Sequence, residues 1–199
     1  MVVKRWLLKI ATKCIKKTIF ILILSSFFIA QAQNNNKTPS VENSVIGVQV
    51  GLFGFWAHFE PKLTPLISLR TEIGLELGLR KGILTNDELV FALLPNIVIE
   101  PRWYYSLERR VRKNRAIAHN SGFFLGFKTR YFPDWFVISN DNNTSVIESL
   151  DFIPKISFRK VWNEHLSFEG GFGIGKSLIL ANNYWDITAE LTFRIGYNF

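Results

Sequence analysis

Four charged side chains interrupt a largely apolar stretch between Leu66 and Arg80. They are Arg70, Glu72, Glu76 and Arg80. All four occupy even positions, whereas the large apolar residues of the stretch occupy odd positions. Carboxylates and guanidinium groups at this spacing could form a catalytic acid–base pair, a lining that selects ions, or a set of mutually neutralising ion pairs. The choice between these chemistries depends on what each face of the stretch contacts.

Charged residues occupy alternate positions of later segments as well, and they could line one common space. With the first four, the set is Arg70, Glu72, Glu76, Arg80, Glu100, Arg102, Lys128, Arg130, Lys155, Arg159, Glu169, Glu190 and Arg194. Buried charges persist in proteins only when they are paired and hydrogen-bonded. We therefore expect these residues to form an interior network of ion pairs, and we assign no catalytic residue among them.

The remaining reactive side chains form no recognisable site. His58, His119 and His165 lack the spacing of metal ligands, so we expect neither a metal nor another cofactor. An alternative is a serine–histidine–carboxylate site on the outer surface, for which His58 is the first candidate. The "GFGIGK" motif at 171–176 alternates like a strand and opens no helix, so it does not predict a phosphate loop.

A basic run follows Glu108 and could contact phosphate groups. It consists of Arg109, Arg110, Arg112, Lys113 and Arg115. Such a cluster suits the phosphates of lipid or lipopolysaccharide headgroups. The other interpretation is a solvated turn, and the sequence leaves both open.

The elements that position these residues are predicted to be β-strands, because hydrophobicity alternates with a period of two from Val45 onward. Seven segments carry this pattern clearly: 45–59, 66–82, 91–107, 122–132, 150–161, 166–178 and 185–199. Polar turns separate them, so we expect an antiparallel meander. The longest segments exceed the five or six residues that are usual in soluble proteins, at about 15.

The first 44 residues carry a different signal. Six of the 24 lysines and arginines fall within positions 1–17, and the apolar run from Ile19 to Ala30 has 12 residues. A membrane-spanning helix needs about 20 residues, so this run and the A-x-A site ending at Ala32 predict a cleaved signal peptide over 1–32. A flexible polar leader is expected over 33–44. The only cysteine, Cys14, lies within the predicted signal peptide.

Net charge gives no support to nucleic-acid binding. The net charge of +8 depends largely on the N-terminal run, because the chain without those six residues carries 18 basic against 16 acidic side chains. We therefore expect no nucleic acid among the partners.

Alternation alone permits a soluble lipocalin-like barrel, with its apolar face inside, or a transmembrane barrel, with its apolar face on lipid. Glycines crowd the polar face, as at Gly74, Gly78 and Gly126, where a solvated strand would gain nothing from them. Aromatic residues gather near strand ends, as they do in interfacial belts. We predict an all-β, antiparallel, up-and-down transmembrane β-barrel over 45–199.

The expected number of strands is eight, because barrels of this kind have an even number. The eighth strand must precede or divide the segment 45–59, or lie in the leader. Counting back from the C-terminus places the basic run at the end of the barrel that carries both chain termini.

The chain resembles the small outer-membrane β-barrels of Gram-negative bacteria, the OmpX-like group. The C-terminal "FRIGYNF" carries the resemblance, as do "EPRWYYSLERR" and "RYFPDWFVIS". The resemblance implies that the alternating C-terminal residues form a signal read by the barrel assembly machinery. These residues are Phe193, Ile195, Tyr197 and Phe199. It also implies location in the outer membrane, with both termini periplasmic and with lipid and lipopolysaccharide as contacts.

These observations favour a non-enzymatic barrel with a structural or surface-interaction role and a lumen filled by ion pairs. The alternatives are a lipid-modifying barrel enzyme, a narrow channel, and a soluble periplasmic lipocalin-like carrier. The sequence specifies neither the ligand nor the oligomeric state.

Overall fold

The computed structural model describes residues 39–80, 90–141 and 144–199. The chain divides into units 1–34 and 35–199, and the described residues belong to the second. The predicted signal peptide and the leader up to residue 38 lie outside them. The elements are β1 (Ser44–Gly51), β2 (Gly54–Thr64), β3 (Ile67–Arg80), β4 (Val90–Trp103), α2 (Leu107–Arg112), η1 (Ala118–Asn120), β5 (Gly122–Phe132), β6 (Ile138–Ser139), β7 (Ser149–Trp162), β8 (Leu166–Ile179) and β9 (Tyr184–Asn198).

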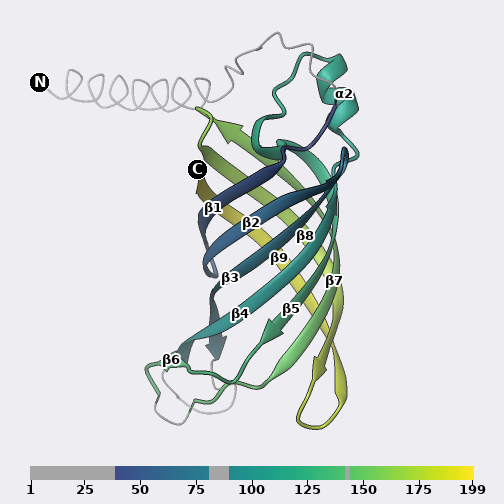
Figure 1. The fold of residues 1–199 in the computed structure, drawn as a ribbon. Helices are drawn as coiled ribbons and strands as arrows, with labels where there is room; N and C mark the ends of the chain where they lie inside the picture. The colour runs from purple at the N-terminus through teal and green to yellow at the C-terminus, as the bar shows by residue number, and fades with distance from the viewer. Residues whose placement is uncertain (1–38, 81–89, 142–143) are drawn as a thin grey trace, which may run out of the picture. The chain divides into compact units, whose positions relative to one another are not determined.

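Eight of these strands form a closed antiparallel barrel. Each strand pairs with the next along the chain, β5 pairs with β7, and β1 pairs with β9 to close the ring (Figure 1). The two-residue strand β6 lies outside the ring and adds to the end of β4. The predicted all-β, antiparallel, eight-stranded barrel is confirmed.

The eighth strand arises because the segment 45–59 folds back on itself. β1 and β2 form a hairpin around Leu52 and Phe53, with Gly51 opposite Gly54 in the register. Gly54 has φ +141°, a backbone conformation that side-chain-bearing residues rarely adopt. The glycines on either side of the turn therefore allow a tight reversal inside what the sequence presents as a single alternating run.

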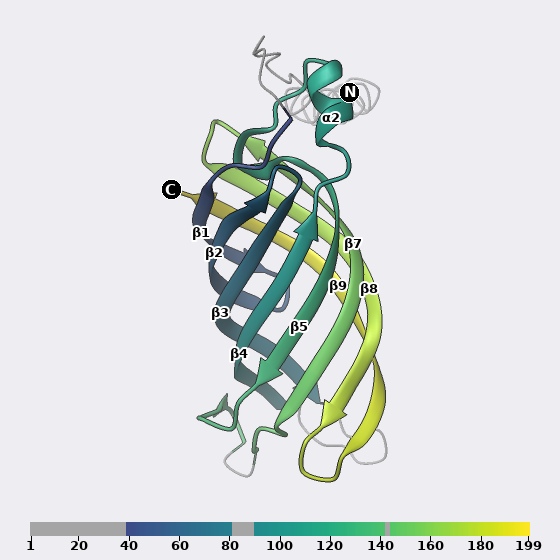
Figure 2. The ribbon, with the colours of Figure 1, turned by 45° about the vertical axis from the view of Figure 1, so that its right-hand side comes forward.

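The two ends of the barrel differ in what they carry. The end where β1 begins and β9 finishes, here called the termini end, also holds α2, η1 and the turns at 65–66 and 163–165 (Figure 2). The opposite end, here called the loop end, holds the β1–β2 turn, the β8–β9 turn and the connection that contains β6. As expected from strand counting, the basic run lies at the termini end.

Residues 39–43 differ from the flexible leader predicted for them, because they are tied to the termini end of the barrel. The amide of Val41 donates to the carbonyl of Pro65 at 2.8 Å, and the Val41 side chain is 3% exposed. The amide of Glu42 donates to Asn120 Oδ1 at 2.8 Å. The leader sequence is polar and of low complexity, so the burial of Val41 was not predicted.

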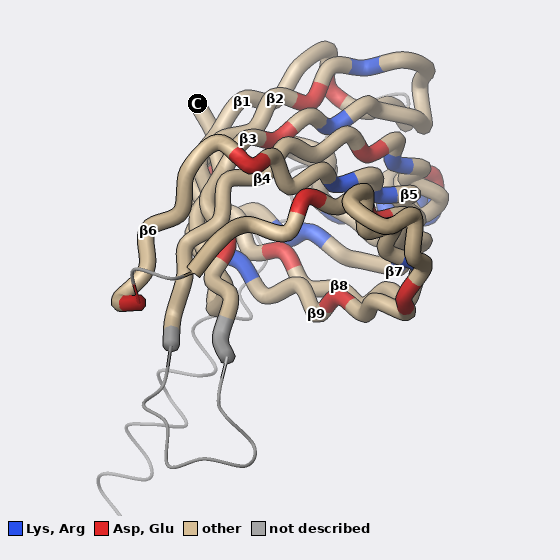
Figure 3. The backbone as a smooth tube through the Cα atoms, turned by 90° about the horizontal axis from the view of Figure 1, so that it is seen from below, with Lys and Arg blue, Asp and Glu red and all other residues tan. Residues whose placement is uncertain are grey.

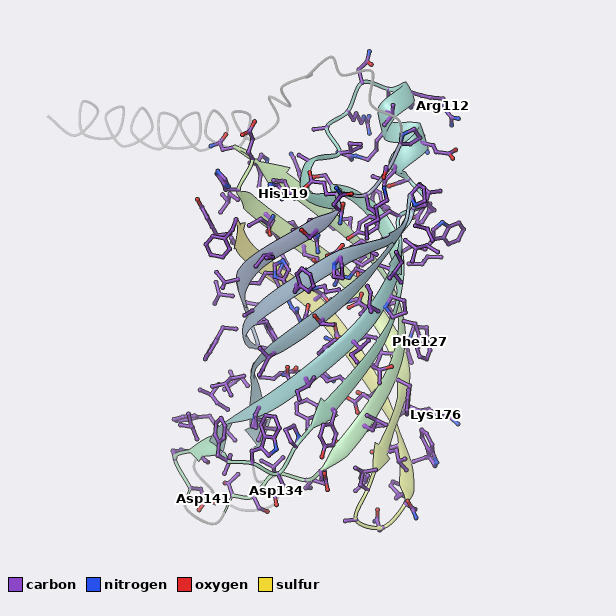
Figure 4. All side chains as sticks on the ribbon, in the orientation of Figure 1. Arg112, His119, Phe127, Asp134, Asp141 and Lys176 are labelled. Atoms are coloured by element: carbon purple, nitrogen blue, oxygen red, sulfur yellow. The ribbon has the colours of Figure 1, made fainter. Side chains whose placement is uncertain are left out.

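The two faces of the wall are sharply different. Ser68, Arg70 and Glu72 of β3 are buried inside, whereas Ile73 is 58% exposed on the outside. The same alternation runs through β5, β7 and β9, and Phe127 can be followed on the outer surface in Figure 4. The apolar face is therefore outside and the charged face is inside. No helix in the described part of the chain is long and apolar enough to cross a membrane.

Candidate functional site

The barrel interior holds a network of ion pairs that is balanced in charge. Its members are the acidic residues Glu60, Glu72, Glu76, Glu100, Asp151, Glu169 and Glu190 and the basic residues Arg70, Arg102, Lys128, Arg130, Lys155, Arg159 and Arg194. Seven negative charges thus balance seven positive charges. Figure 3 marks the positions of acidic and basic residues along the backbone. Balance matters because an unpaired charge in a dry interior costs several kcal/mol, on the order of 3–5.

The network consists of two clusters, each balanced by itself. The termini-side cluster contains Glu60, Arg70, Glu72, Glu100, Arg102, Arg159, Glu169 and Arg194. The loop-side cluster contains Glu76, Lys128, Arg130, Asp151, Lys155 and Glu190. No ion pair among the described residues joins the two.

Glu169 lies at the centre of the termini-side cluster. Both of its oxygens accept from the two terminal nitrogens of Arg102, at 2.9 and 3.1 Å. Oε2 also accepts from Arg159 Nη2 at 3.1 Å. Such two-pronged contacts are the strongest form of carboxylate–guanidinium pairing. Glu169 is fully buried, so its charge depends entirely on these partners.

Glu60 forms a second centre of the same cluster. Oε2 accepts from Arg159 at 2.8 Å. Oε1 accepts from the hydroxyls of Ser68 and Tyr104 at 2.8 and 2.7 Å and from Asn120 Nδ2 at 2.9 Å. These four donors come from four separate parts of the chain, so the carboxylate fixes the wall and the termini end relative to each other.

The loop-side cluster is organised around one arginine and one glutamate. Arg130 donates to Asp151 and to Glu76, each at 2.6 Å. Glu190 accepts from the ammonium groups of Lys128 and Lys155 at 2.8 and 2.9 Å. Glu76 is the most open carboxylate of the network, with 20% of its side chain exposed.

An apolar cap covers the termini end of the lumen. Val41, Tyr104, Leu107 and Phe124 are buried together, and the guanidinium of Arg102 lies 4.4 Å from the centre of the Phe124 ring. Burial raises the pKa of the Tyr104 phenol, which therefore stays protonated and able to donate to Glu60. Toward the loop end, the Arg194 guanidinium stacks 3.7 Å from the centre of the Trp56 ring. Side chains thus fill the lumen at both levels.

The structure brings together eleven of the thirteen charged residues that the sequence assigned to the interior, and these eleven are buried. Glu76 pairs with Arg130 but stays partly open. The side chain of Arg80 lies outside the described part of the structure. Sequence reasoning missed Glu60 and Asp151, although each lies two residues from an inward position of the same strand.

The three histidines occupy unrelated places. His58 points into the lumen from β2 and is 4% exposed, so the suggested site on the outer surface with His58 as its base is wrong in geometry. The His119 ring lies 3.4 Å from Glu42 at the termini end (Figure 4). The His165 ring stacks on Tyr197 and bonds to the Asn198 carbonyl at 2.9 Å. In the described residues, no group of three or more His, Cys, Asp or Glu side chains could hold a metal ion.

The basic run forms the short helix α2 and the turn that follows it. Arg109, Arg112, Lys113 and Arg115 are exposed, and Arg112 can be seen on the outer side of α2 in Figure 4. Arg110 instead donates to the carbonyl of Ala116 at 2.7 Å. Burial, with a smaller contribution from Arg115, lowers the pKa of Arg110. Four cations therefore remain available to an anionic surface.

The C-terminal residues singled out in the sequence form the outer face of β9. Phe193, Ile195, Tyr197 and Phe199 are all exposed. β9 closes the barrel against β1, and the Phe199 amide donates to the Ile46 carbonyl at 2.9 Å. The terminal residue is thus held in the wall by its backbone while its ring stays outside.

The described charged side chains of the interior neutralise one another in ion pairs. Its carboxylates accept from guanidinium and ammonium donors on neighbouring strands. Comparisons of the chain with protein-family models, with curated proteins and with solved structures find no match.

Proposed function

We propose that this chain is an integral outer-membrane β-barrel with a filled lumen and a structural or surface-interaction role. The observation that carries the proposal is the distribution of side chains, with apolar residues outside and ion pairs inside. Large apolar side chains stand exposed on every long strand; they include Ile46, Phe59, Ile73, Ile99, Phe127, Ile156, Phe172 and Leu191. Monomeric soluble proteins rarely expose contiguous apolar patches above a few hundred Å2, about 300–600 at most.

Two aromatic groups support the same proposal. Trp103, Tyr105 and Tyr197 are exposed near the termini end, and Trp135, Tyr184 and Trp185 are exposed near the loop end. Tryptophan and tyrosine favour the headgroup level because one part of the ring is apolar and another is polar. The strands between these groups would cross the hydrocarbon layer, with the termini end in the periplasm.

The filled interior supports a structural or surface role over transport. Eight strands enclose a space that side chains just fill, and here balanced ion pairs, an apolar cap and the Trp56 ring occupy it. Contacts with other molecules are then left to the outside and to the loops. Trp135, Phe136 and Ile138 are exposed in the connection after β5 and are the first candidates for such contacts. We also propose that the chain belongs with the OmpX-like barrels.

Fractionation of cells expressing the full chain tests the proposal. The expected result is a shortened mature chain in the outer-membrane fraction that resists carbonate extraction and whose mobility on a gel changes on heating. A carbonate-soluble periplasmic chain would favour the lipocalin-like carrier and overturn the proposal. Steady single-channel conductance in planar bilayers would overturn the filled lumen and favour the channel.

A further inference from the structure

The barrel wall is incomplete on one side toward the loop end. β1 and β2 have 8 and 11 residues, whereas β3 has 14 and β9 has 15. The β1–β2 hairpin therefore ends well before its neighbours, as Figure 1 shows. The β1–β9 register stops at Gly51 opposite Arg194, and the β2–β3 register stops at Gly54 opposite Glu76. Beyond these pairs no described strand lies between β3 and β9.

The free edge of β9 presents backbone polar groups to this opening. Peptide groups along a strand point alternately to its two edges, and the Phe199 amide bonds to β1. The backbone N–H and C=O groups of the other odd-numbered residues of β9 therefore point to the same edge of the strand. The backbone groups of Ile187, Ala189 and Leu191 lie beyond the residues of β9 that pair with β1. They have no strand partner among the described residues. In a hydrocarbon environment each such group requires a polar partner.

A small pocket, with a cavity volume of about 20 Å3, lies at the base of the opening. Its lining residues are Leu52, Phe53, Trp56, Glu76, Arg130, Glu190, Leu191, Phe193 and Arg194. Four of them, in the turn and on β9, are exposed apolar residues, and four are charged members of the interior network. A cavity of this size has room for about one water molecule, so a lipid headgroup would direct its charged groups at this lining from the opening, with its chain outside.

The charged lining offers both signs. Arg194 uses Nη1 for both oxygens of Glu72, so Nε and Nη2 have no acceptor among the described residues. Those nitrogens and the free β9 amides together can donate to a phosphate. The partly open Glu76 and, beside it, Glu190 can accept from an ammonium. A cation and an anion in one small pocket match a zwitterion better than a singly charged group.

We propose that this lateral pocket binds the headgroup of a phosphoethanolamine lipid, with the acyl chain lying across Leu191, Phe193 and Phe53 on the outer surface. Arg194 and the β9 amides hold the phosphate, and Glu76 holds the ammonium. The inference rests on the proposed outer-membrane function, since it requires lipid around the barrel. The inference assigns a specific lipid and a specific site to an outer surface that would otherwise make only nonspecific contacts with lipid.

Native mass spectrometry of the folded mature chain in dodecyl maltoside tests the proposal, with lysophosphatidylethanolamine as the probe and lysophosphatidylglycerol of the same chain length as its anionic counterpart. One saturable molecule of the first lipid is expected, and binding of the second should be about tenfold weaker because the ammonium contact is missing. Equal retention of both lipids would overturn the proposal.

A matched pair of variants locates the site. Leu191→Trp fills the opening and should reduce binding about tenfold or more. Phe127→Trp places the same ring on the outer face of β5, which pairs with neither β3 nor β9, and should leave binding unchanged. Normal binding by a folded Leu191→Trp variant would overturn the proposal.

Hydrogen exchange on the unaltered chain decides the matter if the Leu191→Trp variant does not fold. The phosphoethanolamine probe should slow exchange at the amides of Ala189 and Leu191, and unchanged rates would overturn the proposal. Failure of any of these binding tests with a chain that fractionates with the outer membrane refutes this inference alone. A chain absent from that membrane refutes the proposed function.

Discussion

Neutralising Glu169 is the sharpest way to test whether the barrel depends on its interior charge balance. The substitution Glu169→Gln preserves the shape of the side chain but removes one negative charge from the termini-side cluster. That cluster then holds four basic residues and three acidic ones. Arg102 and Arg159 lose a shared partner and remain buried, since each is only 1% exposed.

The expected loss of stability follows from the contacts at Glu169. Four hydrogen bonds, between 2.9 and 3.3 Å, run to it from the two arginines. Bonds to charged groups contribute about 1.5–3 kcal/mol each, but they are not additive. Breaking a buried ion pair by removing one partner costs about 3–5 kcal/mol. We expect Glu169→Gln to lower the free energy of unfolding by that amount.

The measurement is equilibrium unfolding in urea of the barrel refolded into lipid vesicles, followed by tryptophan fluorescence and gel mobility. Glu108→Gln is the matched control, because Glu108 is exposed on α2; it should change stability by less than about 0.5 kcal/mol. The double variant Glu169→Gln with Arg159→Gln restores the balance of the cluster. Its loss should be smaller than the sum of the two single losses by at least about 1 kcal/mol.

Two results would refute this reasoning. One is a loss below about 1 kcal/mol for Glu169→Gln, which would mean that water or rearrangement satisfies the remaining arginines. The other is simple additivity in the double variant, which would mean that the charges act independently. Either result would mean that the network fills the lumen but does not determine the stability of the barrel.

Three further predictions use other parts of the molecule. Ile73→Arg should cost about 2–4 kcal/mol in vesicle unfolding if Ile73 faces the bilayer midplane, and no change would contradict lipid contact there. Tyr104→Phe removes a donor from buried Glu60 and should cost about 1–3 kcal/mol by the same assay; an unchanged midpoint would show that the cap is not coupled to the network. Replacing Arg112 and Lys113 by Gln should weaken the binding of anionic vesicles to the termini end in a salt-dependent way and leave the unfolding midpoint alone. Vesicle binding that is indifferent to both salt and the substitutions would support the solvated-turn interpretation.

The fold class was predictable because a sheet with two chemically different faces leaves its period in the sequence. β3 is the clearest case, since its odd and even positions differ in polarity along nearly the whole strand. The hairpin at Leu52 and Phe53 was not located, although the alternation changes phase there, from inward odd positions on β1 to inward even positions on β2. The adjacent apolar residues at 52 and 53 conceal that phase change among the many apolar residues around them, and the glycines at 51 and 54 do not distinguish the turn because glycine is common elsewhere on the inner face.

Side-chain facing was predictable, but pairing was not. Alternation assigns Arg102 and Glu169 to the interior, yet only barrel closure places β4 and β8 close enough for the bidentate contact between them. Glu60 was missed because Pro61 follows it, which suggested a turn, although β2 continues to Thr64. Proline is tolerated in a strand where its missing N–H would not be needed for pairing.

The termini end shows what local patterns fail to encode. α2 has six residues, too few for a helical period to be recognisable, and residues 104–107 continue the alternation of β4 by chance. Tyr104 therefore reads as the end of a strand, whereas it turns inward to cap the lumen and bond to Glu60. Long-range contacts, rather than local propensity, determine the structure of this region.

The most direct test of the account is the accessibility of single cysteines placed along β3. Nitroxide labels at positions 71–76 are compared in vesicles for collisions with lipid-soluble oxygen and with a water-soluble nickel chelate. The account predicts that oxygen reaches labels at odd positions such as 73 and 75, whereas neither reagent reaches labels at 72 and 74. Strong chelate access at the even positions together with weak oxygen access at the odd ones would contradict the proposed facing and reverse the two sides of the wall.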